Sequence, residues 1–162
     1  MAAILRVNMA DLSIRREEIE EPYRGLGGRG LTSAVVAAEV PPHCHPLSAA
    51  NKLVIAPGSL TGTGAPCSGR LSAGAKSPLT WTIKEANSGG MAAIDLAICG
   101  IRAIVVEGRP AAGKWYRLRV SADEAVLEPA DALTGLGNYD TVARQIEQFG
   151  DKVSCISIGQ AG

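Results

Sequence analysis

Polar and apolar residues alternate along several short stretches of the chain, a pattern typical of strands with one buried face. Residues 114–121 and 124–130 alternate in this way and predict a hairpin or a meander. Residues 3–8 and 12–17 predict two short strands around an Ala-Asp turn, and hence another β-hairpin. Further strands are expected from apolar runs and weaker alternation at residues 52–58, 70–76, 79–84, 103–108 and 152–159.

Three helices are expected between these strands. Residues 31–40 are rich in apolar residues and alanine, and the prolines that follow end this helix. Residues 91–100 predict a second helix and residues 141–149 a third. The expected N-caps and stops are Asn87 or Ser88 and Gly100 for the second helix, and Asn138 or Asp140 and Gly150 for the third. Together the elements predict a mixed α and β chain with hairpin-like strand pairs.

Length and composition indicate one globular domain and narrow its partners. The chain has 162 residues, of which 46% are hydrophobic, enough to build a core. Sixteen basic and sixteen acidic residues cancel without forming a long run, so neither nucleic acid nor a membrane surface is an expected partner. A cytoplasmic location is expected, because no apolar stretch has the length of a bilayer span. The chain ends on an expected strand without a polar tail, which predicts a domain truncated at its C-terminal end.

The cysteines and glycines point to different chemistry. Four cysteines lie far apart without a C-x-x-C pair, so no metal site is expected from this chain, and buried, reduced thiols are the preferred interpretation. Nineteen glycines stand against only two tryptophans, three tyrosines and one phenylalanine. Glycine in this number indicates backbone that turns tightly or approaches another molecule closely, which favours a ligand site.

The stretch 62–70, GTGAPCSGR, has the glycine spacing of a phosphate-binding P-loop. Arg70 and Leu71 stand where that motif has lysine and a hydroxyl residue, so the loop fails as a nucleotide site. Local chemistry leaves two interpretations open. The glycines and Arg70 could hold an anion or a heterocycle, or they form a tight turn with an exposed arginine, which local chemistry slightly favours.

Two further glycine stretches carry open alternatives. Residues 25–30, GLGGRG, match G-x-G-x-x-G, but the acidic segment before them is not the buried strand that a dinucleotide fold requires. What remains is a helix start where Arg29 faces an anion, or a purely structural turn. Residues 87–90, NSGG, predict either an ordinary N-cap or backbone that a ligand can approach, and Lys76 is either a second cation for that ligand or a solvated lysine.

Taken together and in order, these segments resemble the N-terminal domain of the tungsten-containing aldehyde ferredoxin oxidoreductases, along essentially the whole chain. The most specific matches are PGSLTGTGAPCSGR and ANSGG. The resemblance is also carried by ILRVNMADLSI, GGRGL, AKSPLT, AIVVEG and SIGQAG. It implies an α+β fold, largely antiparallel β-sheets with about three helices.

In that family the domain is the base on which a bis-pterin cofactor carrying tungsten, or molybdenum, lies. The resemblance implies that Arg70 sits against the pterin near an electron-transfer cluster. It implies contacts from the side chain of Asn87 and the backbone of Gly89, with Ser88 and Gly90 at their flanks and Lys76 as a weaker further contact.

The implied reaction is two-electron oxidation of an aldehyde to its carboxylic acid at tungsten. Electrons would leave through a [4Fe-4S] cluster, held by residues outside this chain, to ferredoxin. Residues 1–162 are therefore expected to be a single N-terminal cofactor-platform domain, inactive alone and without an identified catalytic residue. Its expected partners are the remaining C-terminal domains or a partner subunit, and a homo-oligomer stays open.

Two alternatives remain from the sequence. The chain could be a stand-alone accessory or pterin-binding subunit without catalysis of its own. It could also be a small-molecule phosphate or nucleotide binder that shares only the glycine loops, although the order of distant matching segments argues against this second alternative.

Overall fold

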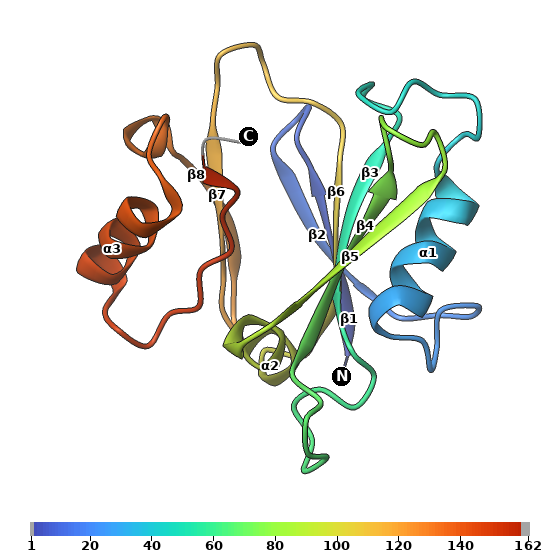
Figure 1. Ribbon diagram of the computed structural model, residues 1–162, viewed down its shortest axis with the longest axis horizontal. Helices are drawn as coiled ribbons and strands as arrows, with labels where there is room; N and C mark the ends of the chain where they lie inside the picture. The colour runs from blue at the N-terminus through green and yellow to red at the C-terminus, as the bar shows by residue number, and fades with distance from the viewer. Residues whose placement is uncertain (1, 160–162) are drawn as a thin grey trace.

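A computed structural model describes residues 2–159, which contain a six-stranded and a two-stranded β-sheet (Figure 1). The six-stranded sheet has the order β2-β1-β6-β3-β4-β5. Neighbouring strands are antiparallel, except that β1 and β6 run parallel. The strands of this sheet are β1 (Ala3–Asn8), β2 (Ser13–Glu18), β3 (Lys52–Pro57), β4 (Arg70–Lys76), β5 (Ile83–Gly89) and β6 (Ile101–Glu107).

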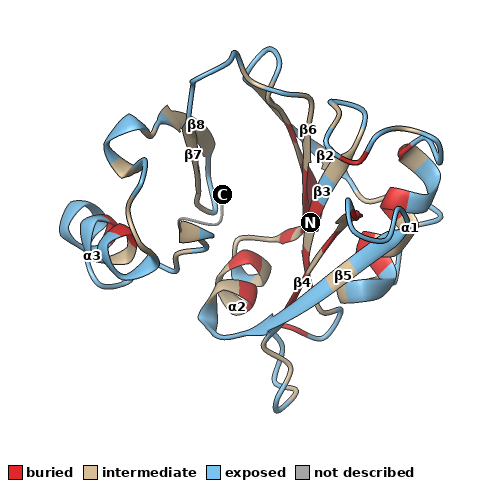
Figure 2. Ribbon diagram, turned by 45° about the horizontal axis from the view of Figure 1, so that its top comes forward, coloured by how far each residue is buried: buried red, intermediate tan, exposed pale blue. Residues whose placement is uncertain are grey.

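Helix α1 (Gly28–Glu39) covers one face of this sheet. Its buried Leu31, Val35 and Val36 join a core cluster with apolar residues of the central strands. The helix lies close to β4 because Gly74 has no side chain: a Cβ there would come within 2.8 Å of Thr32. Figure 2 shows buried positions where α1 meets the centre of the sheet, and further ones on α2. Apolar burial on this face is a main source of the stability of the fold.

The opposite face is covered by α2 (Met91–Ile98) and by a separate hairpin, β7 (Tyr116–Val120) and β8 (Ala125–Pro129). Leu118 and Leu127 of the hairpin pack against a second core cluster, to which Leu96 of α2 belongs. The last helix, α3 (Asn138–Phe149), follows the short 3-10 turn Asp131–Leu133 and lies beyond the hairpin (Figure 1).

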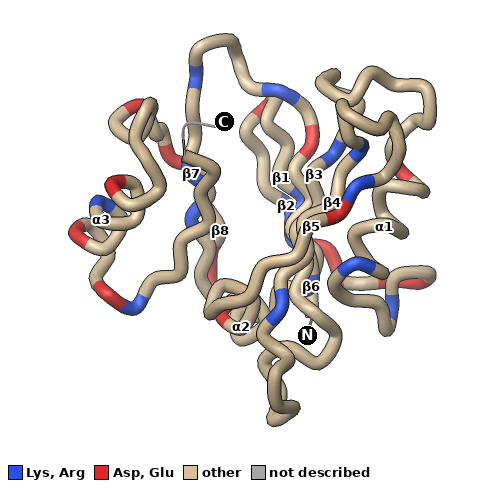
Figure 3. The backbone as a smooth tube through the Cα atoms, in the orientation of Figure 1, with Lys and Arg blue, Asp and Glu red and all other residues tan. Residues whose placement is uncertain are grey.

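A largely buried ion-pair network joins α1 to the sheet. The Glu39 carboxylate lies 2.5 Å from Nη1 of Arg6 on β1 and 2.8 Å from Nζ of Lys52 on β3. Lys52 also contacts Glu107 at the end of β6, at 2.6 Å. Elsewhere, charged positions of both signs are interspersed along the chain (Figure 3). No helix within residues 2–159 is long and apolar enough to cross a bilayer.

The structure confirms the α+β class, both predicted hairpins and the three helices. Gly150 ends α3 and Gly100 follows the end of α2, each with the positive φ expected after a helix. Within residues 2–159, no side-chain hydrogen bond caps α3, and its N-cap residue is Gly137. The predicted caps of α3, Asn138 or Asp140, were therefore wrong.

Three other expectations were wrong. The strand expected at 79–84 begins only at Ile83, because residues before it form the turn after β4. Asn87 and Ser88 do not cap α2, since they pair with β4 inside β5, and Gly90 is the N-cap residue. Residues 152–159, where a strand was expected, do not form a strand. Residues 160–162 of the SIGQAG segment lie outside the described residues.

Candidate functional site

Pairing of β4 with β5 brings the two most specific sequence motifs together. In the register of this pair, Arg70 stands opposite Gly89, and Ser72 stands opposite Asn87. Because side chains alternate across a sheet, all four positions lie on the face that carries α1. Ser88 is opposite Leu71, which belongs to the core cluster on the other face. The predicted residues Arg70, Asn87 and Gly89 therefore share one surface, and Ser88 does not.

The guanidinium of Arg70 lies beside the backbone of Gly89. A Cβ at position 89 would be 3.8 Å from Nη1 of Arg70, and both residues are exposed. Glycine here leaves bare backbone next to a positive charge. A planar guanidinium beside open backbone can bind oxygen atoms or the edge of a heterocycle.

The start of α2 adds positive polarity to this surface. The helix begins at Met91, directly after Gly89 and Gly90, and Gly90 has a φ of 117° that favours glycine. Within the described residues its first turn has neither a side-chain cap nor an acidic residue. The start of α2, with its first-turn N–H groups and the positive end of its helix dipole, therefore follows Gly89, the strand partner of Arg70, by two residues, and such a helix start attracts anions.

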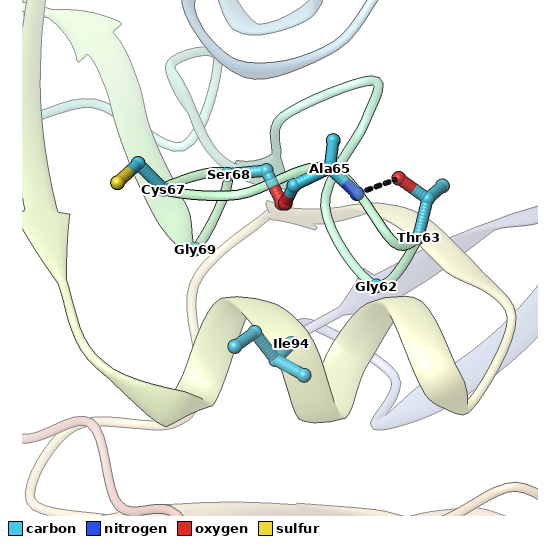
Figure 4. Close-up of a pocket in the computed structure, with 7 residues that line it drawn as sticks. All are labelled: Gly62, Thr63, Ala65, Cys67, Ser68, Gly69 and Ile94. Atoms are coloured by element: carbon cyan, nitrogen blue, oxygen red, sulfur yellow. Dashed lines mark hydrogen bonds between the residues drawn. The ribbon is translucent and has the colours of Figure 1, made fainter.

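The glycine loop 62–69 packs against α2 and frames a hollow of about 320 Å³ (Figure 4). Its hydroxyl groups hold the loop itself: Ser68 Oγ donates to the Ala65 carbonyl at 2.9 Å, and Thr63 Oγ1 accepts from the Ala65 N–H at 3.2 Å. The hollow is lined by Gly62, Thr63, Ala65, Cys67, Ser68, Gly69 and Ile94. The loop is thus a turn that its own hydrogen bonds stabilise, and it ends at the exposed Arg70.

The structure does not bring Lys76 to this surface. It lies at the other end of β4, six residues from Arg70, a distance of about 20 Å along an extended strand. Its buried Nζ donates to the carbonyl oxygens of Pro42 at 2.5 Å and Cys44 at 2.7 Å. Lys76 therefore holds the loop after α1 in place.

The GLGGRG segment serves helix packing. A Cβ at Gly27 would come within 2.4 Å of the Ser59 nitrogen, so glycine allows the start of α1 to touch the loop after β3. The guanidinium of Arg29 pairs with the Glu85 carboxylate of β5 at 2.9 Å. The sequence did not predict the Arg29–Glu85 ion pair or the hydrogen bond from the Ser72 hydroxyl to Asn87. In each contact the two partners are far apart in the chain.

The cysteines differ from the expectation of buried thiols. Cys67 is exposed, and the other three are half-buried; all four are free. Partial burial raises the pKa of the Cys155 thiol. Within residues 2–159 no group of three or more His, Cys, Asp and Glu side chains is arranged to hold a metal ion.

Known proteins resemble this chain along nearly its whole length. The family described as aldehyde ferredoxin oxidoreductase, N-terminal domain, matches residues 4–162. The tungsten-containing aldehyde ferredoxin oxidoreductases of Pyrococcus furiosus and Thermococcus kodakarensis are 40% and 38% identical to it over 161 residues. Each match covers 98% of this chain and 26% of the relative, so the chain spans about a quarter of the length of these curated relatives.

A solved structure shows that the similarity extends to the fold. The active site complex BamBC of benzoyl coenzyme A reductase, in complex with 1,5-dienoyl-CoA, has a chain of the same fold, with a TM-score of 0.93 and 26% identity. The match covers 99% of this chain and 25% of that one. By sequence and by fold, the chain belongs to the aldehyde ferredoxin oxidoreductase family and corresponds to its N-terminal domain.

Proposed function

We propose that the chain is the platform for a tungsten–pterin cofactor in an aldehyde-oxidising enzyme, with Arg70, Asn87 and Gly89 as its main contacts. One observation carries this proposal: the β4–β5 register places Arg70 against Gly89, next to the uncapped start of α2 among the described residues. Gly90 and Ser88 flank these contacts in the chain, with the Ser88 position on the other face of the sheet, while Lys76 holds a distant loop and is left out.

The residues present fit such a cofactor. Arg70 and the N–H groups of α2 supply positive polarity for the negative charge of the cofactor, and Gly89 lets its flat ring approach the backbone. When bound, the tungsten–pterin group supplies the two-electron oxidation chemistry. The part of this chain is to bind the pterin, to fix its orientation and to balance its charge. The same chemistry at molybdenum is the alternative for the metal.

An aldehyde is the proposed substrate because relatives with 40% and 38% identity to this chain are named aldehyde ferredoxin oxidoreductases. The benzoyl coenzyme A reductase complex shares the fold at 26% identity. Since both kinds of enzyme carry this domain, the substrate is selected by parts outside it. Ferredoxin is proposed as the electron acceptor on the same grounds, through a [4Fe-4S] cluster that those outside parts hold.

We further propose that residues 1–162 act as one domain within a cytoplasmic enzyme, together with the domains that make up the other three quarters of its relatives. These domains could lie in the same polypeptide or in a partner subunit. A stand-alone pterin-binding subunit without catalysis remains the second candidate, because the proposed contacts all lie within this chain.

The test is to produce the longest native polypeptide that contains this chain in cells supplied with tungstate. Tungsten is measured by mass spectrometry and pterin by the fluorescence of its oxidised derivative. We expect both in the wild type and a loss of roughly tenfold or more in Arg70→Ala, the size expected when a charged contact is removed. Arg15→Ala, at an exposed arginine of the opposite edge strand, is the control.

A folded wild-type protein without tungsten, molybdenum or pterin would refute the proposal. Cofactor bound by the 162-residue chain alone would instead favour the stand-alone subunit. Oxidation of aldehydes by the longer polypeptide, with reduction of ferredoxin, tests the proposed reaction.

A further inference from the structure

Ser72 and Asn87 form a cross-strand hydrogen bond in the middle of the proposed site. Ser72 lies on β4 with 3% of its surface exposed, and its Oγ donates to Oδ1 of Asn87 at 2.7 Å. The two residues are direct partners in the β4–β5 register. A buried hydroxyl needs such a partner, because an unpaired one would carry a desolvation cost.

This bond decides which end of the Asn87 amide is free. Its Oδ1 accepts from Ser72, so the exposed residue keeps its Nδ2 group with two N–H donors. Within residues 2–159 no protein acceptor is bonded to Nδ2. Asn87 therefore presents a hydrogen-bond donor at a surface that already carries the guanidinium of Arg70.

The start of α1 supports the Ser72 hydroxyl from behind. Gly28 has a φ of 51°, and a Cβ there would lie 3.3 Å from Ser72 Oγ. Backbone at the start of α1 thus lies close to the Ser72 hydroxyl on this side, and the hydroxyl donates across the sheet to Asn87.

We propose that Ser72 is a positioning residue, which holds the Asn87 amide as a hydrogen-bond donor toward an acceptor nitrogen or oxygen of the pterin cofactor. This inference rests on the proposed function for the identity of the ligand. The positioning itself is a property of the chain without ligand, so the two can be tested apart.

The first experiment uses the full chain without cofactor, labelled with nitrogen-15. We expect the side-chain N–H₂ group of Asn87 to be ordered in the wild type, and its order parameter to fall below about 0.6 in Ser72→Ala. Ser48→Ala is the matched control, because its buried hydroxyl has no hydrogen-bond partner among residues 2–159. An unchanged order parameter in Ser72→Ala refutes the positioning role, whatever the protein binds.

The second experiment measures pterin retained after gel filtration by the longer polypeptide from tungstate-supplied cells. We expect Ser72→Ala to lose roughly tenfold in retention, as for the loss of one positioned hydrogen bond. In an Asn87→Ala background, Ser72→Ala should cause no further loss, since it acts through Asn87. A general structural effect of Ser72→Ala would persist in that background and would overturn the inference.

Asn87→Asp tests the donor assignment, because a carboxylate of the same shape only accepts hydrogen bonds. We expect it to lose retention at least as strongly as Asn87→Ala. Normal retention in Asn87→Asp would show that the ligand donates, which overturns the assignment. A folded wild type that contains no pterin would refute both the proposed function and the claim that Asn87 donates to a pterin. The order parameter of the Asn87 amide would still test whether Ser72 positions that amide.

Discussion

Arg70 and Gly89 are cross-strand partners on β4 and β5, and the missing side chain of Gly89 leaves the guanidinium beside bare backbone. Replacing Gly89 by alanine tests whether this open backbone matters. The new methyl would lie 3.8 Å from Nη1 of Arg70, an ordinary contact in extended strand backbone, so the free energy of unfolding should change by less than about 1 kcal/mol.

Pterin retention should fall roughly tenfold in Gly89→Ala, because the methyl occupies the surface that the ring approaches. Retention is measured after gel filtration, and stability by urea unfolding. Gly64→Ala is the matched control, since nothing among the described residues lies within 4 Å of its Cβ position. Equal retention in both variants would rule out close approach of the ligand at Gly89.

Lys76 should behave as a structural residue. Lys76→Met removes a buried ammonium that binds the carbonyl oxygens of Pro42 and Cys44, and leaves both without that donor. We expect a loss of about 1–3 kcal/mol in the free energy of unfolding. Pterin content per folded protein should stay unchanged. Lys84→Met, at an exposed position of β5, is the control for stability; a pterin loss confined to Lys76→Met would restore Lys76 to the site.

Acid should weaken the link between α1 and the sheet. Hydrogen bonds from Arg6, and then from Lys52, lower the pKa of Glu39 from 4.5 to about 2. Partial desolvation of the carboxylate opposes this shift. A carboxyl with a lowered pKa stabilises the fold above its unfolded pKa, and this contribution is lost as pH falls from about 4.5 to about 2. After allowance for solvent screening, we expect a contribution of about 1–2 kcal/mol.

Urea unfolding between pH 2 and pH 6 measures this dependence. Glu39→Gln should flatten the slope of stability with pH across that interval, while Glu18→Gln, on the edge strand β2, should keep it. If Glu39→Gln keeps the wild-type slope, the acid dependence originates from other carboxyl groups.

Sequence patterns predicted the elements whose signals are local. The mostly apolar residues 3–8 mark β1 because that central strand is buried on both faces, with Ile4 in one core cluster and Leu5 and Val7 in the other. The strand β5 gave no such signal, since its residues are mostly exposed at the edge of the sheet. Its Asn87 and Ser88 have cap-like side chains, and only the pairing with β4 decides their conformation.

The same limit applies to the candidate site. The motifs around Arg70 and Asn87 were visible in the sequence, and their proximity follows from strand pairing. Lys76 stood out as a charge near those motifs, but its partners lie 34 and 32 residues earlier in the chain. Conversely, the expected strand 152–159 has a β-like pattern, yet within residues 2–159 it has no strand partner, so it stays irregular.

The contact between α1 and β4 gives a last prediction, on the packing that places the helix start behind Ser72. A Cβ at Gly74 would come within 2.8 Å of Cβ and Oγ1 of Thr32, which is fully buried. Gly74→Ala must therefore push α1 away from the sheet, and we expect a loss of about 1–3 kcal/mol in the free energy of unfolding. Thr32→Ala removes the opposing Oγ1, so the double variant should recover part of this loss. Urea unfolding of the single and double variants measures the coupling, and purely additive losses would mean that Oγ1 of Thr32 does not oppose the new methyl group.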